Sequence, residues 1–257
     1  MNSIILFVDS ERADQYLNPI VYCVLRLDVR KVTFIHIRGL LAGEESTGAR
    51  GLSGRAMGAV QAQLEGLVER GEYLFTTAEH AGQRRQLADI YGEQGAREIR
   101  AFYRQCRDAP LEYNNEEISY SDLRKCMHRI AKLGSGVYID VTAIRKRYIG
   151  DLVAASLIEG IEGLYTFDLV GVSPNFREPW RVLMHELDEQ PSAFSYTNLL
   201  NTPVYRACVR LVALRAPALK VSLLTTVALL VAVVVVSQFL EPDNVGIRVM
   251  FTISAIP

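Results

Sequence analysis

Three cations stand together in the stretch YIDVTAIRKR, where Arg145, Lys146 and Arg147 follow a short run of strand-forming residues. Backbone N–H groups at the start of a helix, the positive end of the helix dipole and nearby cations together form a site for phosphate. Cations at a helix N-terminus are unfavourable unless an anion offsets them, although a solvated first turn is the simpler alternative. We favour a bound anion. The residues expected to contact it are Thr142, Ala143, Arg145, Lys146 and Arg147.

Two further loops carry polar side chains directly after apolar runs. The run at residues 4–8 is followed by DSERADQYLN, and the run at 32–37 is followed by an arginine and a glycine. In doubly wound sheets, ligands bind beyond the carboxyl ends of the strands, where the strand order switches. The residues predicted to join the site from these loops are Asp9, Ser10, Arg12, Asn18, Arg38 and Gly39.

The elements that must position these loops follow from the hydrophobic pattern. Residues 18–30 place Ile20, Val24 and Leu27 on one helical face. Helices are also expected near 56–70, 78–108, 119–132 and 145–159, and strands near 73–76, 137–140, 164–169 and 180–187, with a break at 110–117. The strands are near-continuously apolar, which indicates a parallel sheet covered on both faces. The predicted fold class is α/β, a Rossmann-like, doubly wound and mostly parallel sheet.

The C-terminal part differs in kind from the rest. From Val221 to Leu240 the chain has no charged residue, and twenty residues are about what a helix needs to cross a bilayer core. A buried soluble helix is the alternative, but the stretch is apolar on all sides. Basic residues precede it and acidic residues follow it, which predicts a single-pass protein of the inner membrane with a cytoplasmic N-terminal domain. The predicted organisation is a sheet domain at 1–190 with an insertion at about 39–117, a helical linker at 191–220, a transmembrane helix at 221–240 and a short apolar tail at 241–257.

Composition and motifs give no sign of catalysis. The 28 basic residues balance 29 acidic ones, which argues against a general attraction to nucleic acid, and the four cysteines contain no CxxC pair. The apolar N-terminus reads as a strand and not as a signal peptide. HExxH, GxSxG, Walker and GxGxxG motifs are missing. His36 is expected in the core or at its rim, His128 has no evident partner, and Glu79–His80 and His185–Glu186 lack metal-pair spacing. We therefore predict no catalytic residue, no metal site and no cofactor.

The stretch YIDVTAIRKRYIGDLVAASLIEG, followed by the strand GLYTFDL, resembles the CRISPR-associated Rossmann fold, or CARF, and its relatives in antiphage signalling. The segment NPIVYCVLRLDVRKVTFIHI is similar to the first βαβ unit of that family. The resemblance covers roughly residues 3–40 and 134–170. Lys146 holds the place of the family's lysine, whereas Ala143 and Ile144 stand where its turn usually has two glycines.

This resemblance implies a sensor that dimerises and holds a cyclic oligonucleotide, such as cyclic oligoadenylate, across a two-fold axis. Joined to a membrane helix, it implies a bacterial or archaeal antiviral effector in which the nucleotide controls membrane disruption or pore formation. The expected partners are a second copy of the chain, higher oligomers in the membrane, the lipid bilayer, and a synthase or CRISPR complex that supplies the nucleotide. Two alternatives stay open. One is a ring-nuclease-like enzyme that uses Thr142 and Lys146, and the other is a non-catalytic membrane anchor for a protein partner.

Overall fold

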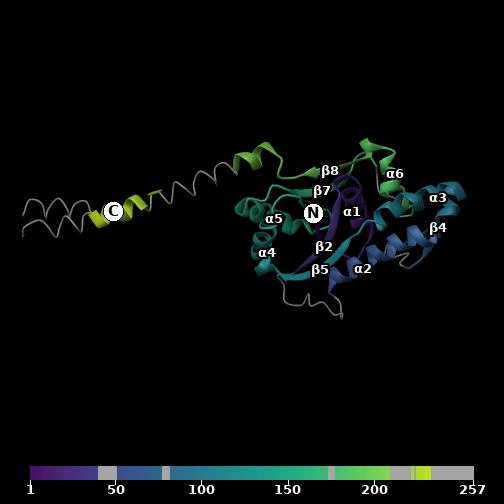
Figure 1. Ribbon diagram of the computed structural model, residues 1–257, viewed down its shortest axis with the longest axis horizontal. Coiled ribbons are helices and arrows are strands. Elements are labelled where there is room, and N and C mark those ends of the chain that lie inside the picture. The colour runs from purple at the N-terminus through teal and green to yellow at the C-terminus, as the bar shows by residue number, and fades with distance from the viewer. Residues whose placement is uncertain (40–50, 77–81, 173–176, 209–220, 223, 233–257) are drawn as a thin grey trace, which may run out of the picture. The chain divides into compact units, whose positions relative to one another are not determined.

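The computed structural model describes residues 1–39, 51–76, 82–172, 177–208, 221–222 and 224–232. The chain divides into two units, Met1–Tyr205 and Arg206–Pro257. The first unit holds a six-stranded sheet in the order β5-β2-β1-β6-β7-β8 (Figure 1). Neighbouring strands are parallel except for β8, which runs antiparallel to β7. These observations confirm the predicted α/β class and the Rossmann-like, mostly parallel sheet.

The strand order switches between β1 and β6. The strands of the sheet are β1 (Asn2–Val8), β2 (Val29–Arg38), β5 (Glu112–Ser119), β6 (Val137–Asp140), β7 (Leu164–Leu169) and β8 (Phe194–Asn198). The chain runs from β1 outward through β2 to β5, and then returns to the other side of β1 to form β6. Leu6 of β1 lies opposite Asp140 of β6. The loops that follow β1 and β6 therefore leave the sheet side by side, at the place where such folds bind ligands.

Helices cover the sheet on both faces. α1 (Asp14–Leu27), α2 (Leu52–Glu65), α3 (Leu87–Arg107) and α6 (Met184–Asp188) lie on one side, and α4 (Leu123–Ala131) and α5 (Lys146–Glu159) on the other (Figure 1). Short helical turns complete the unit: η1 (Gly66–Arg70), η2 (Tyr120–Asp122), η3 (Pro179–Val182) and η4 (Pro191–Ala193). Along β1, Leu6 belongs to one core and Phe7 to the other. Both cores are fully apolar at β1, as the near-continuous apolar strands predict.

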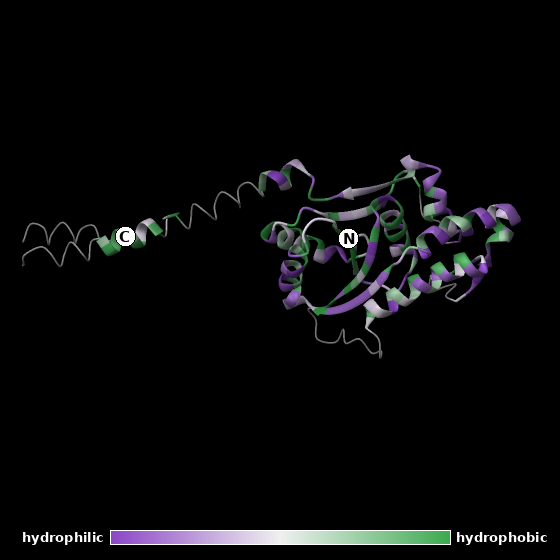
Figure 2. Cartoon of the chain, viewed as in Figure 1, coloured by the Kyte–Doolittle hydropathy of each residue, from purple (hydrophilic) through white to green (hydrophobic). Residues whose placement is uncertain are grey.

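Strand β5 contradicts the predicted break at 110–117. Its sequence EYNNEEIS has one large aliphatic residue, Ile118, and Figure 2 shows the strand mostly in purple. β5 pairs in parallel with β2 and forms one edge of the sheet. Charged residues are typical of edge strands because they discourage further pairing. Its three glutamates pair with cations of the same chain: Glu112 with Lys31, Glu116 with Arg129 and Glu117 with Arg38.

Two predicted helix starts were too late. α1 begins at Asp14, one turn before Asn18, although Pro19 favours the first turn of a helix. α2 begins at Leu52 rather than near residue 56, so residues 52–58 are helical and not part of a loop. The predicted helix at 78–108 loses its start to β4 (Arg84–Gln86), which forms a separate hairpin with β3 (Glu72–Leu74). The predicted Glu79–His80 neighbours and residues 40–50 of the predicted insertion lie outside the described residues.

The region beyond the predicted boundary at residue 190 belongs to the sheet domain. Residues 180–187, predicted as a strand, form η3 and α6, and the buried Trp180, Leu183, Met184 and Leu187 have helical spacing. β8 then lies inside the predicted 191–220 linker. The rings of Phe194 and Phe167 stack with centroids 5.2 Å apart. The compact unit consequently extends to Tyr205.

The second unit is described only in part. Its described residues, 206–208, 221–222 and 224–232, are helical. The side chains of Leu224, Leu229 and Leu230 are exposed. Among the described residues, no helix has both the length and the apolar character needed to cross a membrane. The whole predicted tail at 241–257, together with residues 223 and 233–240 of the predicted 221–240 helix, lies outside the described part.

Candidate functional site

Asp9 and Arg145 meet at the switch in strand order. Asp9 follows β1, and Arg145 is the N-cap residue of α5. The Arg145 Nε donates a short hydrogen bond to Asp9 Oδ2. The Asp9 side chain is 13% exposed and that of Arg145 is 45% exposed, so the carboxylate is set deeper than the guanidinium. The structure thus brings together two predicted site residues that lie 136 positions apart.

The cations that follow Arg145 stay at the surface. Lys146 and Arg147 form the exposed first turn of α5. The Arg147 guanidinium lies over the ring of Tyr148, 4.8 Å from its centroid, and Tyr148 is itself buried. Among the described residues, Lys146 has no ion-pair partner. The first turn of α5 therefore presents positive charge to solvent, at the end of the helix where the dipole favours an anion.

The loop between β1 and α1 is held from within by Tyr16. The buried Tyr16 hydroxyl accepts hydrogen bonds from the backbone N–H groups of Asp9 and Ser10, at 3.3 and 3.2 Å, and donates to the Ser10 carbonyl at 2.9 Å. Arg12 pairs with Asp14, its NH2 group 2.6 Å from Oδ2. Because these loop N–H groups are already bonded, an anion at this edge would have to be held mainly by side-chain cations.

The turn after β6 is also built from its own polar groups. Asp140 accepts hydrogen bonds from the backbone N–H and the hydroxyl of Thr142, both at 3.0 Å. The Thr142 hydroxyl in turn accepts from the N–H of Phe167 in β7 at 2.8 Å. Ile144 is buried in the core beneath α5. Asp140 and Thr142 thus connect β6 to β7. The buried Ile144 side chain fixes the turn at a place where two glycines would leave it more flexible.

Asp140 is a fully buried carboxyl group, 1% exposed, beneath this turn. Burial raises the pKa of Asp140 to about 7, and the Thr142 hydrogen bonds offset only part of that effect. The buried hydroxyl of Tyr196 on β8 lies near Asp140. Its pKa is raised by burial first and then by the Asp140 charge. The Asp140 side chain is consequently neutral in a large fraction of molecules at neutral pH.

Replacing this carboxyl group should change how stability depends on pH. Since the folded-state pKa of Asp140 lies above its unfolded value, the stability that it contributes is complete below about pH 4 and is lost as pH rises through about 7. Asp140→Asn keeps an acceptor for the Thr142 N–H but cannot ionise. Urea unfolding of both proteins is expected to show the variant gaining about 3 kcal/mol on wild type between pH 4 and pH 7. A difference that stays constant over this range would contradict a titrating Asp140.

The other predicted site residues lie elsewhere. Asn18 is inside α1 and buried, and its Nδ2 donates to the carbonyl of Val182 at 2.7 Å. It links α1 to η3 and does not face the switch, because α1 begins a turn earlier than the sequence predicted. Arg38 is the last residue of β2 rather than a loop residue, and Gly39 follows it. Arg38 Nε lies 4.0 Å from Glu117 Oε2.

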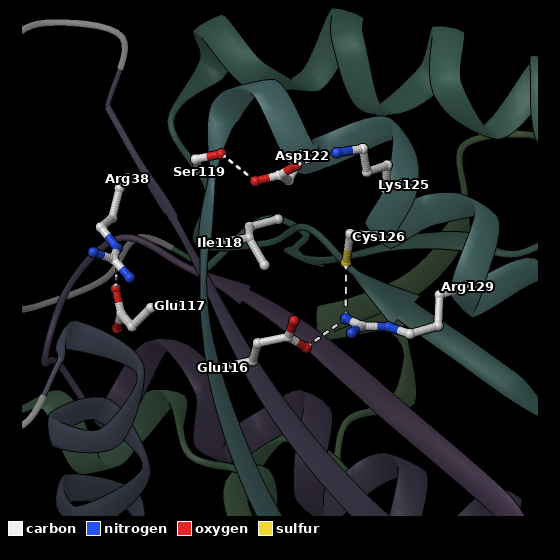
Figure 3. A pocket seen from close by; sticks show the side chains of 9 residues that line it. All are labelled: Arg38, Glu116, Glu117, Ile118, Ser119, Asp122, Lys125, Cys126 and Arg129. Atoms are coloured by element: carbon white, nitrogen blue, oxygen red, sulfur yellow. Dashed lines mark hydrogen bonds and ion pairs between the residues drawn. The ribbon is translucent and has the colours of Figure 1, made fainter.

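Arg38 lines a pocket at the ends of β2 and β5, away from the switch. The pocket has a volume of about 570 Å³ and is bounded by β2, β5, η2 and α4 (Figure 3). Ile118 and Cys126 form a buried part of its wall. Three cations face it, each with a carboxylate partner: Arg38 with Glu117, Lys125 with Asp122 and Arg129 with Glu116. The lining is therefore neutral overall, and no residue of the β1 or β6 loops contributes to it.

Glu117 holds the start of α2 against the end of β2. Its Oε1 accepts hydrogen bonds from the N–H and hydroxyl of Ser53, both at 2.8 Å, and its Oε2 lies 2.7 Å from His36 Nδ1. Burial raises the pKa of Glu117, but the His36 and Ser53 hydrogen bonds outweigh it and leave that pKa below its usual range. Gly51 permits this approach, since a Cβ there would lie 2.3 Å from Glu117 Oε1. The anion at this helix N-terminus is the protein's own carboxylate.

The three described histidines do not assemble a catalytic group around the switch. His36 is half-buried against Glu117, near the rim of the core, as predicted. His128 Nδ1 lies 2.6 Å from Glu159 Oε2, a partner that the sequence did not suggest. Burial lowers the pKa of His185 to about 4, and its two ring nitrogens contact the hydroxyls of Tyr91 and Tyr103. Across the described ranges, no group of three or more His, Cys, Asp or Glu side chains could hold a metal ion.

The fold and the switch define a Rossmann-like α/β domain with a cationic helix N-terminus at the switch in strand order. No family model matches the chain, and no curated protein matches it. Among solved structures, it is similar to Enterococcus italicus Csm6 bound to cyclic hexa-2'-fluoro-hexa-dAMP, with 10% sequence identity and a TM-score of 0.33. The match covers 78% of this chain and 43% of the other, so the chain spans less than half of that protein's length. A TM-score this low establishes no shared fold.

Proposed function

We propose that the sheet domain is a sensor that binds a cyclic oligonucleotide through its phosphates at the β1–β6 switch. The observation that carries this proposal is the meeting of Asp9 and Arg145 at that switch, beside the exposed Lys146 and Arg147. Phosphodiesters suit such a site because each carries one negative charge and several acceptor oxygens for guanidinium groups. The CARF resemblance of the β6 turn and of the first βαβ unit supports a cyclic ligand such as cyclic oligoadenylate.

The output that we propose is at the membrane. The twenty uncharged residues at 221–240 have the composition and length of a single transmembrane helix, with basic residues before it and acidic residues after it. A single helix can form a pore only by assembling with other copies. The protein would therefore act as a homodimer or higher oligomer in a bacterial or archaeal inner membrane, and a synthase or CRISPR complex would supply the nucleotide. The ring-nuclease alternative is less favoured, since the Thr142 hydroxyl is already bonded to Asp140 and to the Phe167 N–H. A non-catalytic membrane anchor is the other alternative.

Calorimetric titration with cyclic tri-, tetra- and hexaadenylate tests the binding proposal. Wild-type protein is expected to bind at least one ring, and Arg145→Ala with Lys146→Ala to weaken that binding by roughly 10- to 100-fold, because two charge-assisted contacts are lost. Lys132→Ala is the matched control. It removes an exposed cation at the C-terminal end of α4, shortly before the start of β6 and therefore away from the switch. The variant should bind like wild type. Chromatography of the samples is expected to return the ligand intact.

Three outcomes would count against this assignment. Failure of wild type to bind any of the three rings would reject the proposed ligand class. Equal affinity in wild type and in the double variant would place the binding site away from the start of α5. An equal loss in the Lys132 control would mean that overall charge, rather than the switch, governs the affinity.

A further inference from the structure

We infer that Asp9 is a built-in competitor for the ligand at Arg145. This inference rests on the proposed function and concerns the regulation of the same site. In the structure, the Asp9 carboxylate accepts the hydrogen bond of the Arg145 Nε, in the place that one phosphate oxygen of a bound nucleotide would take. A phosphodiester and a carboxylate carry the same charge, so one can replace the other on the guanidinium without changing the net charge of the site.

The geometry makes the exchange accessible. The Arg145 side chain is 45% exposed while that of Asp9 is 13% exposed, so the guanidinium can reach outward and the carboxylate stays behind it. Asp9 is not needed to shape its own loop, because the buried Tyr16 hydroxyl already binds the loop N–H groups of Asp9 and Ser10. The charge of Asp9 can therefore be removed while the loop keeps its main hydrogen bonds.

The dipole of α5 favours a negative charge at the position of Asp9. The loop containing Asp9 leads to the start of α1, and Arg145 caps the start of α5. The N-terminus of α5 and its cations make this corner favourable for an anion even without a ligand. In the ligand-free protein Asp9 supplies that anion, and it neutralises Arg145 but not Lys146. Binding of a ligand breaks the Asp9–Arg145 pair, and the free energy lost with that pair reduces the affinity. The displaced Asp9 carboxylate also repels the negative charge of the ligand.

Removing the Asp9 charge should consequently tighten binding. Asp9→Asn keeps the size of the side chain, and cyclic adenylates are expected to bind it roughly 3- to 10-fold more tightly than wild type at low salt. The gain should shrink as salt screens the repulsion. Glu112→Gln is the matched control, since it removes an exposed carboxylate at the start of β5. The start of β5 lies at the end of the sheet away from the switch, so affinity should be unchanged.

Calorimetry on the full chain in detergent, with cyclic tri-, tetra- and hexaadenylate, separates the outcomes. Tighter binding by Asp9→Asn but not by Glu112→Gln is the expected result. Equal or weaker binding by Asp9→Asn, with wild type still binding, overturns the competitor role and leaves the proposed function standing. No binding by wild type and by both variants rejects the proposed function itself. Should Asp9→Asn melt at a lower temperature than wild type, Asp9→Ser removes the same charge and decides between these outcomes.

Discussion

Ending the chain after Gln190 is expected to leave a protein that does not fold, whereas ending it after Tyr205 is expected to leave a folded domain. The shorter protein loses β8, which pairs with β7 along Tyr165–Leu169. It also loses the stacking of Tyr196 on Tyr165 and of Phe194 on Phe167, with ring centroids 5.1 and 5.2 Å apart. Since a domain is stable by only about 5–15 kcal/mol, the loss of a strand and two partly buried aromatic rings is enough to unfold it.

Soluble yield and the thermal transition seen by circular dichroism measure this effect. The protein ending at Tyr205 retains the Tyr205 hydroxyl bond to the Ile161 carbonyl, at 3.1 Å, and should show one cooperative transition. It should also need no detergent, whereas the full chain should fractionate with membranes if 221–240 spans the bilayer as proposed. Equal transitions in the two shortened proteins would show that β8 is dispensable. A requirement for detergent in the protein ending at Tyr205 would count against the membrane proposal for the tail.

Thr142→Val is expected to destabilise the domain by about 2–3 kcal/mol. The substitution keeps the branched shape but removes the hydroxyl that donates to Asp140 and accepts from the Phe167 N–H. Both partners then lose a hydrogen bond in a partly buried place, and unsatisfied groups of this kind cost more than the bond itself contributes.

Thr142→Ser provides the matched control, because it keeps the hydroxyl and loses only a methyl group. Urea unfolding at pH 7 should place it within about 1 kcal/mol of wild type. Similar losses of stability in the serine and valine variants would mean that the methyl group matters more than the hydrogen bonds. Unchanged stability in the valine variant would mean that the bridge from β6 to β7 is not needed.

Much of the sheet could be predicted because its central strands are apolar and stand out in the sequence. β1, β6 and β7 are short apolar runs, and the predicted strand at 164–169 has the observed bounds. α5 begins one residue after its predicted start. The edges were missed for a physical reason. β5 and β8 each have a neighbour on one side only, so they carry polar residues that resemble a loop or a linker.

The site was partly predictable for a similar reason. Sequence order and the switch rule suffice to predict that the loops at Asp9 and Arg145 meet, since the carboxyl ends of β1 and β6 must be adjacent. Side-chain partners over long distances were not predictable. Glu117 reaches Ser53 across 64 positions, and Tyr196 reaches Asp140 from a region that read as a linker. Asn18 was misplaced because the start of its helix was misplaced.

The position of β8 in the chain also fixes an order of events while the protein is being made. Domains fold as units during synthesis, from the N-terminus onward. This sheet, however, is completed by its last strand, which ends at Asn198, and the apolar stretch begins at Val221. Few residues separate the completion of the domain from the appearance of the segment that would direct the nascent chain to a membrane. If 221–240 spans the bilayer as proposed, folding of the domain and delivery of the ribosome to the membrane would occur at nearly the same time. A mutation that slows the pairing of β8 would then act first on biogenesis.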